Sequence, residues 1–157
     1  MPRLTGYPVD SRFTKKAVPQ TVRLEALRQV GLFKGVSKRS LIRIDQLSEV
    51  RSALPGAVIV AQGDAGNEMM VVLEGRASVT RGTRKLNELS VGQVFGEMAL
   101  LDNQPRSATV TALEPMRMLV IHGPEFRKLM SKVPGLTDAL LATLCARLRD
   151  AHAAADL

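Results

Sequence analysis

The chain has 157 residues, a length typical of one globular domain, which excludes a multidomain enzyme. Apolar residues make up 45% of it and charged residues 24%, so collagen-like and low-complexity chains are excluded as well. The longest apolar runs have five residues, against the roughly 20 that a membrane helix needs. The first residues also lack the apolar stretch of a secretory signal. We therefore predict a cytoplasmic protein without a membrane span.

Few side chains suit catalysis or metal binding. Cys145 is the one cysteine, and His122 and His152 are the two histidines. They provide no cluster with the spacing of zinc ligands and few partners for a Ser–His or Cys–His pair. We predict no enzymatic activity, no cofactor and no metal site. Cys145 lies in an apolar helical stretch, so we expect it to be buried by packing.

The positive charge is concentrated at the start of the chain. Residues 1–43 hold ten Lys or Arg and two acidic residues, a net charge of +8, whereas residues 44–157 hold twelve against thirteen, a net charge of −1. Residues 1–20 contain three prolines and no helical periodicity, which predicts a basic, extended N-terminal arm. Aromatic residues make up only 3% of the chain, so nucleic-acid binding is disfavoured. The arm suits solubility or contact with an acidic protein partner.

Two helices are predicted over residues 21–50. The first begins at Thr21, and its apolar residues recur at helical spacing until Gly31. The second begins at Ser37 or Lys38 and ends before Ser52, where Pro55-Gly56 then turns the chain. The two apolar stripes are Val22, Leu24, Leu27 and Val30, and Leu41, Ile42, Ile44 and Leu47.

Residues 52–122 have the pattern of short strands separated by glycines and other turn residues. Tight turns at this spacing favour an antiparallel roll or sandwich over βαβ units. The predicted strands are Val58–Ala61, Met69–Leu73, Arg76–Thr80, Lys85–Leu89, Ala108–Ala112 and Met116–Ile121.

Residues 124–154 are predicted to form the C-terminal helices. Pro124 opens the first of them, and Pro134-Gly135 interrupts it. The final helix runs from about Leu136 to Ala154. We expect its apolar stripe to be core or the seam of a homodimer rather than a lid over a ligand. The stripe consists of Leu136, Leu140, Leu141, Leu144, Leu148 and Ala151.

Residues 92–110 interrupt the strand pattern and carry the candidate chemistry. Gly96 allows a close backbone approach, and residues 97–101 are good helix formers. The N–H groups at the start of such a helix suit a bound anion, which the guanidinium of Arg106 can also contact. Glu97 repels a multiply charged phosphate, but it can accept hydrogen bonds from sugar hydroxyls. The pattern favours a nucleotide with one negative charge. The alternative to a nucleotide site is that Glu97 is only an acidic residue placed favourably at a helix start. Arg106 would then be a surface arginine paired with Asp102 or Glu97.

This stretch resembles the phosphate-binding cassette of cyclic nucleotide-binding domains. The family includes the bacterial catabolite activator protein, the regulatory subunits of cAMP-dependent kinase and cyclic-nucleotide-gated channels. The cassette residues, 95–110, are Phe95-Gly96-Glu97-Met98-Ala99-Leu100 and Pro105-Arg106-Ser107-Ala108-Thr109-Val110. Further matches are Gly31-Leu32-Phe33, Leu54-Pro55-Gly56, Gly63-Asp64-Ala65-Gly66 and Glu74-Gly75. The resemblance covers residues 22–152.

The resemblance implies an α+β fold, in which an antiparallel β-roll is flanked by N-terminal and C-terminal helices. Such a roll is a double-stranded β-helix similar to a jelly roll, and the domain is expected over residues 21–157. By the same resemblance, Arg106 pairs with the exocyclic phosphate oxygens and Glu97 binds the ribose 2′-hydroxyl. The rest of the predicted cradle consists of Gly96, Met98, Ala99, Leu100, Ser107 and Ala108. Ser107 favours cAMP over cGMP as the ligand, while cGMP stays open.

One position departs from the family pattern. In the catabolite activator, the helix after the roll supplies a hydroxyl side chain to adenine, but that position is Ala151 here, followed by His152. We expect the base to pack on Leu148 or Ala151 with His152 as a polar contact, unless the helix is shifted. The sequence also stops where the activator continues into a helix-turn-helix, so DNA recognition by that route is not expected.

The function predicted from the sequence is that of a regulatory sensor that prefers cAMP. Ligand binding at the cassette repositions the C-terminal helices, which signal to an unidentified protein partner or through a homodimer. Three alternatives stay open. The chain is an interaction or structural module of the same fold that binds no nucleotide, a fragment of a larger cAMP-regulated protein, or a nucleic-acid-binding protein that uses its arm.

Overall fold

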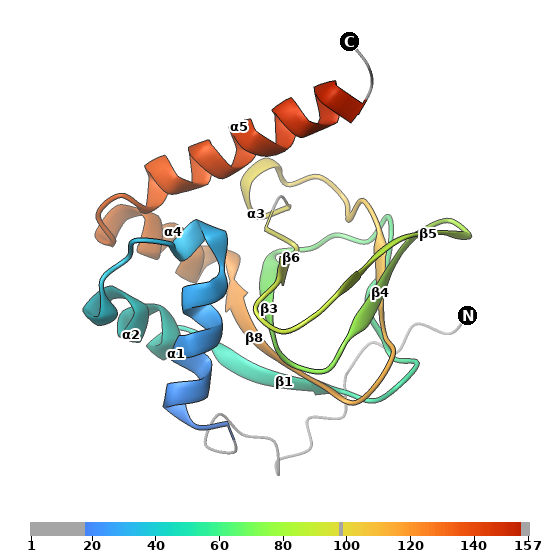
Figure 1. Cartoon of the computed structure of the whole chain (residues 1–157), viewed down its shortest axis with the longest axis horizontal. Helices are drawn as coiled ribbons and strands as arrows, with labels where there is room; N and C mark the ends of the chain where they lie inside the picture. Colours follow the sequence, from blue (N-terminus) through green and yellow to red (C-terminus); the bar gives the residue numbers. More distant parts are fainter. Residues whose placement is uncertain (1–17, 98, 155–157) are drawn as a thin grey trace.

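The computed structural model describes residues 18–97 and 99–154, with helices and strands labelled as in Figure 1. All but the last three residues of the predicted N-terminal arm lie outside this part of the chain. The helices are α1 (Gln20–Gln29), the 3-10 helix η3 (Gly31–Phe33), α2 (Lys38–Gln46), α3 (Ala99–Asp102), α4 (Gly123–Lys132) and α5 (Leu136–Ala154). The strands are β1 (Glu49–Ala53), β2 (Val58–Val60), β3 (Glu68–Glu74), β4 (Ala77–Arg81), β5 (Arg84–Leu89), β6 (Val94–Phe95), β7 (Thr109–Ala112) and β8 (Met116–His122).

The described strands form two antiparallel four-stranded sheets that together make a β-roll (Figure 1). One sheet has the order β1-β8-β3-β6 and the other has the order β2-β7-β4-β5. Apolar residues of both sheets form one core: Ala53, Ile59, Met70, Val72, Ala77, Leu89, Phe95, Val110, Ala112, Met116, Met118 and Val120. The predicted fold class, an α+β fold with an antiparallel β-roll flanked by helices, is therefore confirmed.

Strand β3 is apolar on both faces because it lies between two cores. Met70 and Val72 belong to the core between the sheets. Met69, Val71 and Leu73 belong to a second core, which the helices form against the outer face of the same sheet. Successive side chains of a strand point to opposite faces, so a strand covered on both sides needs an unbroken apolar run. The run at residues 69–73 is that strand.

Helices α1 and α2 are joined by a buried ion pair that the sequence pattern did not indicate. Arg23 donates from Nε to Asp45 Oδ1 at 2.6 Å and from Nη2 to Asp45 Oδ2 at 2.9 Å. Its Nη1 donates to the carbonyl of Val18, which is itself buried. Arg23 is 8% exposed and Asp45 is 1% exposed, so the pair is shielded from water. It fixes the start of the described chain against both helices.

One helix boundary was predicted wrongly and two strands were not predicted. The second helix was expected to continue almost to Ser52, but α2 ends at Gln46 and a strand begins at Glu49. Strand β1 was missed because charged residues alternate along it, so it lacks an apolar face until Ala53. Strand β6, Val94–Phe95, was missed as well, because two residues show no periodicity.

The final helix has the predicted bounds, but only its start is buried. Leu136 and Leu140 belong to the helical core, while Leu141 is 56% exposed and Leu148 is 60% exposed. Cys145 is exposed, so the prediction that packing buries it is wrong. Figure 1 shows that α5 starts beside α4 and then runs across the top of the view above α3, and its main contacts are with η3 and α4. None of the described helices is both long and apolar enough to cross a membrane.

Candidate functional site

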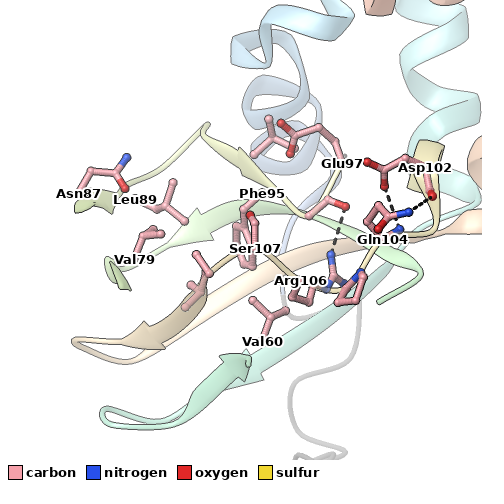
Figure 2. A pocket seen from close by; sticks show the side chains of 15 residues that line it. Val60, Val79, Asn87, Leu89, Phe95, Glu97, Asp102, Gln104, Arg106 and Ser107 are labelled. Atoms are coloured by element: carbon pink, nitrogen blue, oxygen red, sulfur yellow. Dashed lines mark hydrogen bonds between the residues drawn. The ribbon is translucent and has the colours of Figure 1, made fainter. Parts of the chain in front are cut away.

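A cavity of about 300 Å³ lies within the β-roll, next to the segment that contains α3 (Figure 2). This volume is at the lower end of the range for small-molecule sites. The lining combines an apolar wall with a group of polar side chains. It consists of Val60, Val79, Asn87, Leu89, Val94, Phe95, Gly96, Glu97, Asp102, Gln104, Pro105, Arg106, Ser107, Ala108 and Val110.

Arg106 lies at the polar end of this cavity and is held there by backbone carbonyls. It is only 7% exposed. Its Nη1 donates to the carbonyl of Gly96 at 3.2 Å, and its Nη2 donates to the carbonyl of Glu68 at 3.0 Å. The backbone of Arg106 also exchanges hydrogen bonds with the turn before β3, to Asp64 at 2.8 Å and from Gly63 at 2.9 Å. The guanidinium is therefore a fixed, buried cation at the cavity wall.

Two glycines make room for the Arg106 guanidinium. Gly96 has φ +85°, and a Cβ there would lie 2.6 Å from Arg106 Nη1 and 2.6 Å from the carbonyl oxygen of Glu68. A Cβ at Gly66 would lie 1.9 Å from Arg106 Nε and 2.2 Å from its Cζ. Side chains do not fit at such distances. The guanidinium thus occupies space that exists only because positions 66 and 96 have no side chain.

The structure brings five of the predicted site residues together on the cavity. These are Gly96, Glu97, Arg106, Ser107 and Ala108. Glu97 is 6% exposed, so a second ionisable side chain is buried beside the cavity. A buried arginine and a buried glutamate on one small cavity suit a ligand that has both an anionic group and hydroxyl groups.

The short helix of the cassette starts later than predicted. It was expected from Glu97, but α3 comprises Ala99–Asp102. Leu100 is 3% exposed and packs in the helical core, so its side chain does not line the cavity. Met98 and the side chain of Ala99 lie outside the described part of the structure. The expected cradle of backbone N–H groups at these positions stays a prediction.

Two of the three candidate base contacts on α5, Leu148 and His152, are not among the described residues that line the cavity. Leu148 and His152 are exposed, and the side chain of Ala151 is not among those described. Contact between these residues and a bound base stays a prediction.

The apolar wall and Asn87 were not predicted from the sequence. Val60 and Val79 were assigned to strands without a role in the site, and Val110 was named only as the last residue of the cassette. Asn87 and Leu89 are two residues apart on β5 and both line the cavity. The signal that was available is this alternation, because residues i and i+2 of a strand face the same side.

One cluster of side chains outside the cavity has potential metal ligands. Carboxylate oxygens of Glu49 and Glu68 and the ring nitrogens of His122 lie within 4.8 Å of one another. Arg51 Nη2 donates to Glu49 Oε1 at 2.9 Å and to Glu68 Oε2 at 2.6 Å, while His122 Nε2 is 3.0 Å from Glu49 Oε1. Burial alone lowers the pKa of Arg51, but its hydrogen bonds to Glu68 and Glu49 outweigh burial and raise it. The guanidinium of Arg51 forms ion pairs with both carboxylates, so the cluster is an ion-pair network.

A family model described as "Cyclic nucleotide-binding domain" matches residues 50–133, which include every residue of the cavity lining. The chain belongs to the cyclic nucleotide-binding domain family. This cyclic nucleotide-binding domain keeps Gly96, Glu97 and Arg106, the residues on which the resemblance was based, and its structure places all three on one cavity.

The domain is similar to proteins of several kinds. It is 35% identical over 118 residues to a cyclic nucleotide-gated potassium channel of Rhizobium etli, covering 75% of this chain and 33% of the channel. It is 31% identical over 121 residues to a cAMP-dependent protein kinase regulatory subunit of Mycosarcoma maydis, covering 71% and 23%. The crystal structure of Thermus thermophilus catabolite activator protein superposes with a TM-score of 0.76 at 30% identity, covering 80% and 62%. The chain thus spans a third or less of these two curated relatives.

Proposed function

We propose that this cyclic nucleotide-binding domain is a regulatory sensor that binds one cyclic nucleotide, preferably cAMP, in the cavity beside Arg106. The observation that carries the proposal is the guanidinium of Arg106, which is buried and held by the carbonyls of Gly96 and Glu68. A fixed cation at the wall of a small cavity attracts a single negative charge more strongly than the same cation in water. The proposal assigns no catalytic step to the domain.

Each polar residue of the cavity has a role in this proposal. Arg106 pairs with the exocyclic oxygens of the phosphodiester, because its planar guanidinium offers two parallel N–H groups. Glu97 accepts a hydrogen bond from the ribose 2′-hydroxyl. Ser107 can donate a further bond from its hydroxyl. The apolar wall then faces the purine.

The relatives support a regulatory output. One is named as a regulatory subunit of cAMP-dependent kinase and another as a cyclic nucleotide-gated channel, so related domains belong to proteins controlled by cyclic nucleotides. In this chain, we assign the output to α5, whose far half is exposed. Ligand binding brings Leu148, Ala151 and His152 towards the base, and this movement signals to a protein partner or to a second copy through the exposed leucines.

The test is a calorimetric titration of refolded, ligand-stripped protein with cAMP and then with cGMP. We expect saturable binding of one nucleotide per chain, tighter for cAMP. Arg106→Ala removes a charge-assisted pair that is worth at least about 2 kcal/mol, and should weaken binding about 30-fold or more. Arg84→Ala removes an exposed arginine of β5 as the matched control and should bind like the wild type. Folded protein that takes up neither nucleotide would favour an interaction module without a ligand.

A further inference from the structure

The guanidinium of Arg106 joins β3 and β6 at the point where the pairing of these two strands ends. Strand β6 has two residues, and both of them pair with β3. Gly96 follows β6 directly, and Glu68 is the first residue of β3. The carbonyls of these two residues both accept hydrogen bonds from Arg106. The position of the guanidinium therefore depends on where the backbone of Glu68 is held.

A second arginine, Arg51 of β1, holds the side chain of Glu68. Its Nη2 donates to Glu68 Oε2 at 2.6 Å, and its Nη1 donates to Glu68 Oε1 at 3.3 Å. Two N–H groups on two carboxylate oxygens form the bidentate arrangement that gives an ion pair a defined geometry. The side chains of Arg51 and Glu68 are 21% and 28% exposed. Salt screens such a partly buried pair less than it screens a pair in open solvent.

The pair of Arg51 with Glu68 ties three strands together. Strand β8 lies between β1 and β3 in this sheet (Figure 1), so the ion pair crosses it. On β8, His122 is the ladder partner of Glu68, and its Nδ1 lies 3.6 Å from Glu68 Oε2. Residues 61–67, which precede β3, contain neither helix nor strand. The ion pair thus anchors β3 at the point where this irregular segment enters the sheet.

We propose that Arg51 is a positioning residue for nucleotide binding, because it holds Glu68, whose carbonyl in turn holds the guanidinium of Arg106. Arg51 is not among the described residues that line the cavity, so it acts through these two residues rather than on the ligand. Without Arg51, the start of β3 is held less firmly and Arg106 loses a fixed acceptor. A binding site needs its polar groups within about 0.5 Å of the productive position. This inference rests on the proposed function.

The experiment measures the affinity for cAMP by calorimetric titration of Arg51→Gln and Glu68→Gln. Each variant should bind cAMP about three- to thirtyfold more weakly than the wild type, the usual effect of a change in a supporting network. The double variant should stay within about twofold of the weaker single one, because either change already breaks the pair. Arg51→Lys keeps the charge and should recover part of the affinity. Arg76→Gln is the matched control, because Arg76 also forms ion pairs with two glutamates, Glu88 and Glu114.

The Arg106→Ala background separates positioning from a general effect on the fold. There, Arg51→Gln should change cAMP affinity by less than about twofold, because the group that it positions is absent. The same loss in both backgrounds would overturn the proposal. Binding of cAMP to folded Arg51→Gln within twofold of wild type would overturn only the role of Arg51, and Glu68→Gln tests the same link if Arg51→Gln does not fold. A wild type that binds neither cAMP nor cGMP would overturn the proposed function and this inference together.

Discussion

Gly66→Ala tests how the cavity holds its arginine without changing any polar group. A Cβ at position 66 would lie 1.9 Å from Arg106 Nε, whereas ordinary contacts begin at 3.4 Å. The guanidinium must therefore retreat by about 1.5 Å, the difference between the two distances. Gly66 does not need a left-handed backbone, so alanine adds volume without backbone strain.

The size of the effect follows from the contacts of the guanidinium. Its hydrogen bonds to Gly96 and Glu68 are 3.2 and 3.0 Å long. A shift of this size takes both beyond hydrogen-bond distance and moves Arg106 away from the place where the phosphate binds. A hydrogen bond to a charged group is worth about 1.5 to 3 kcal/mol, so cAMP affinity should fall about ten- to a hundredfold.

Calorimetric titration with cAMP measures the loss, and thermal unfolding shows that the variant is folded. Gly31→Ala is the matched control, because a Cβ there meets nothing within 4 Å. Binding to folded Gly66→Ala within twofold of wild type would refute the reasoning, since the arginine would then serve the ligand equally well from a displaced position.

Two predictions concern stability. Arg23→Met leaves the Asp45 carboxylate buried without its bidentate partner, so the free energy of unfolding in urea should fall by about 3 to 5 kcal/mol. Burial alone raises the pKa of Glu49, but hydrogen bonds from Arg51 and His122 outweigh burial and lower it below the usual 4.5. Its contribution to stability is therefore present above pH 4.5 and is lost as pH falls through the lowered pKa. The stability difference between wild type and Glu49→Gln, followed by urea unfolding from pH 7 to pH 3, should shrink below pH 4.5.

Each of these two stability predictions can be contradicted by a defined outcome. Arg23→Met would contradict the first if it destabilised the protein no more than Arg28→Met, which removes an exposed arginine of α1. A stability difference for Glu49→Gln that stays constant over the whole pH range would contradict the second.

The sequence was informative wherever local chemistry determines structure. Glycines and alternating apolar residues located most strands within one or two residues, because turns and two-residue periodicity need only neighbours in the chain. The cassette was visible because Gly96, Glu97 and Arg106 lie within eleven consecutive residues. The structure then placed all three on one cavity.

The missed features depend on distant parts of the chain. Strand β1 pairs its charged residues with Glu68 and His122, which are far away in the sequence. The β-bulge of β5 is defined only by the pairing of this strand with β4. The exposure of Cys145 reflects how far α5 extends beyond its packing partners, which helical periodicity alone does not tell. Register and docking are set by the partner element, so one strand or helix taken alone cannot reveal them.

The exposed thiol on α5 is also a labelling site that the sequence already contains. Cys145 is the one cysteine of the chain, and it lies on the helix whose movement the proposed signal requires. A maleimide dye therefore attaches to a single known position, with no cysteine to remove and none to introduce. Its fluorescence during a cAMP titration follows α5 directly, in the same protein whose binding is measured by heat.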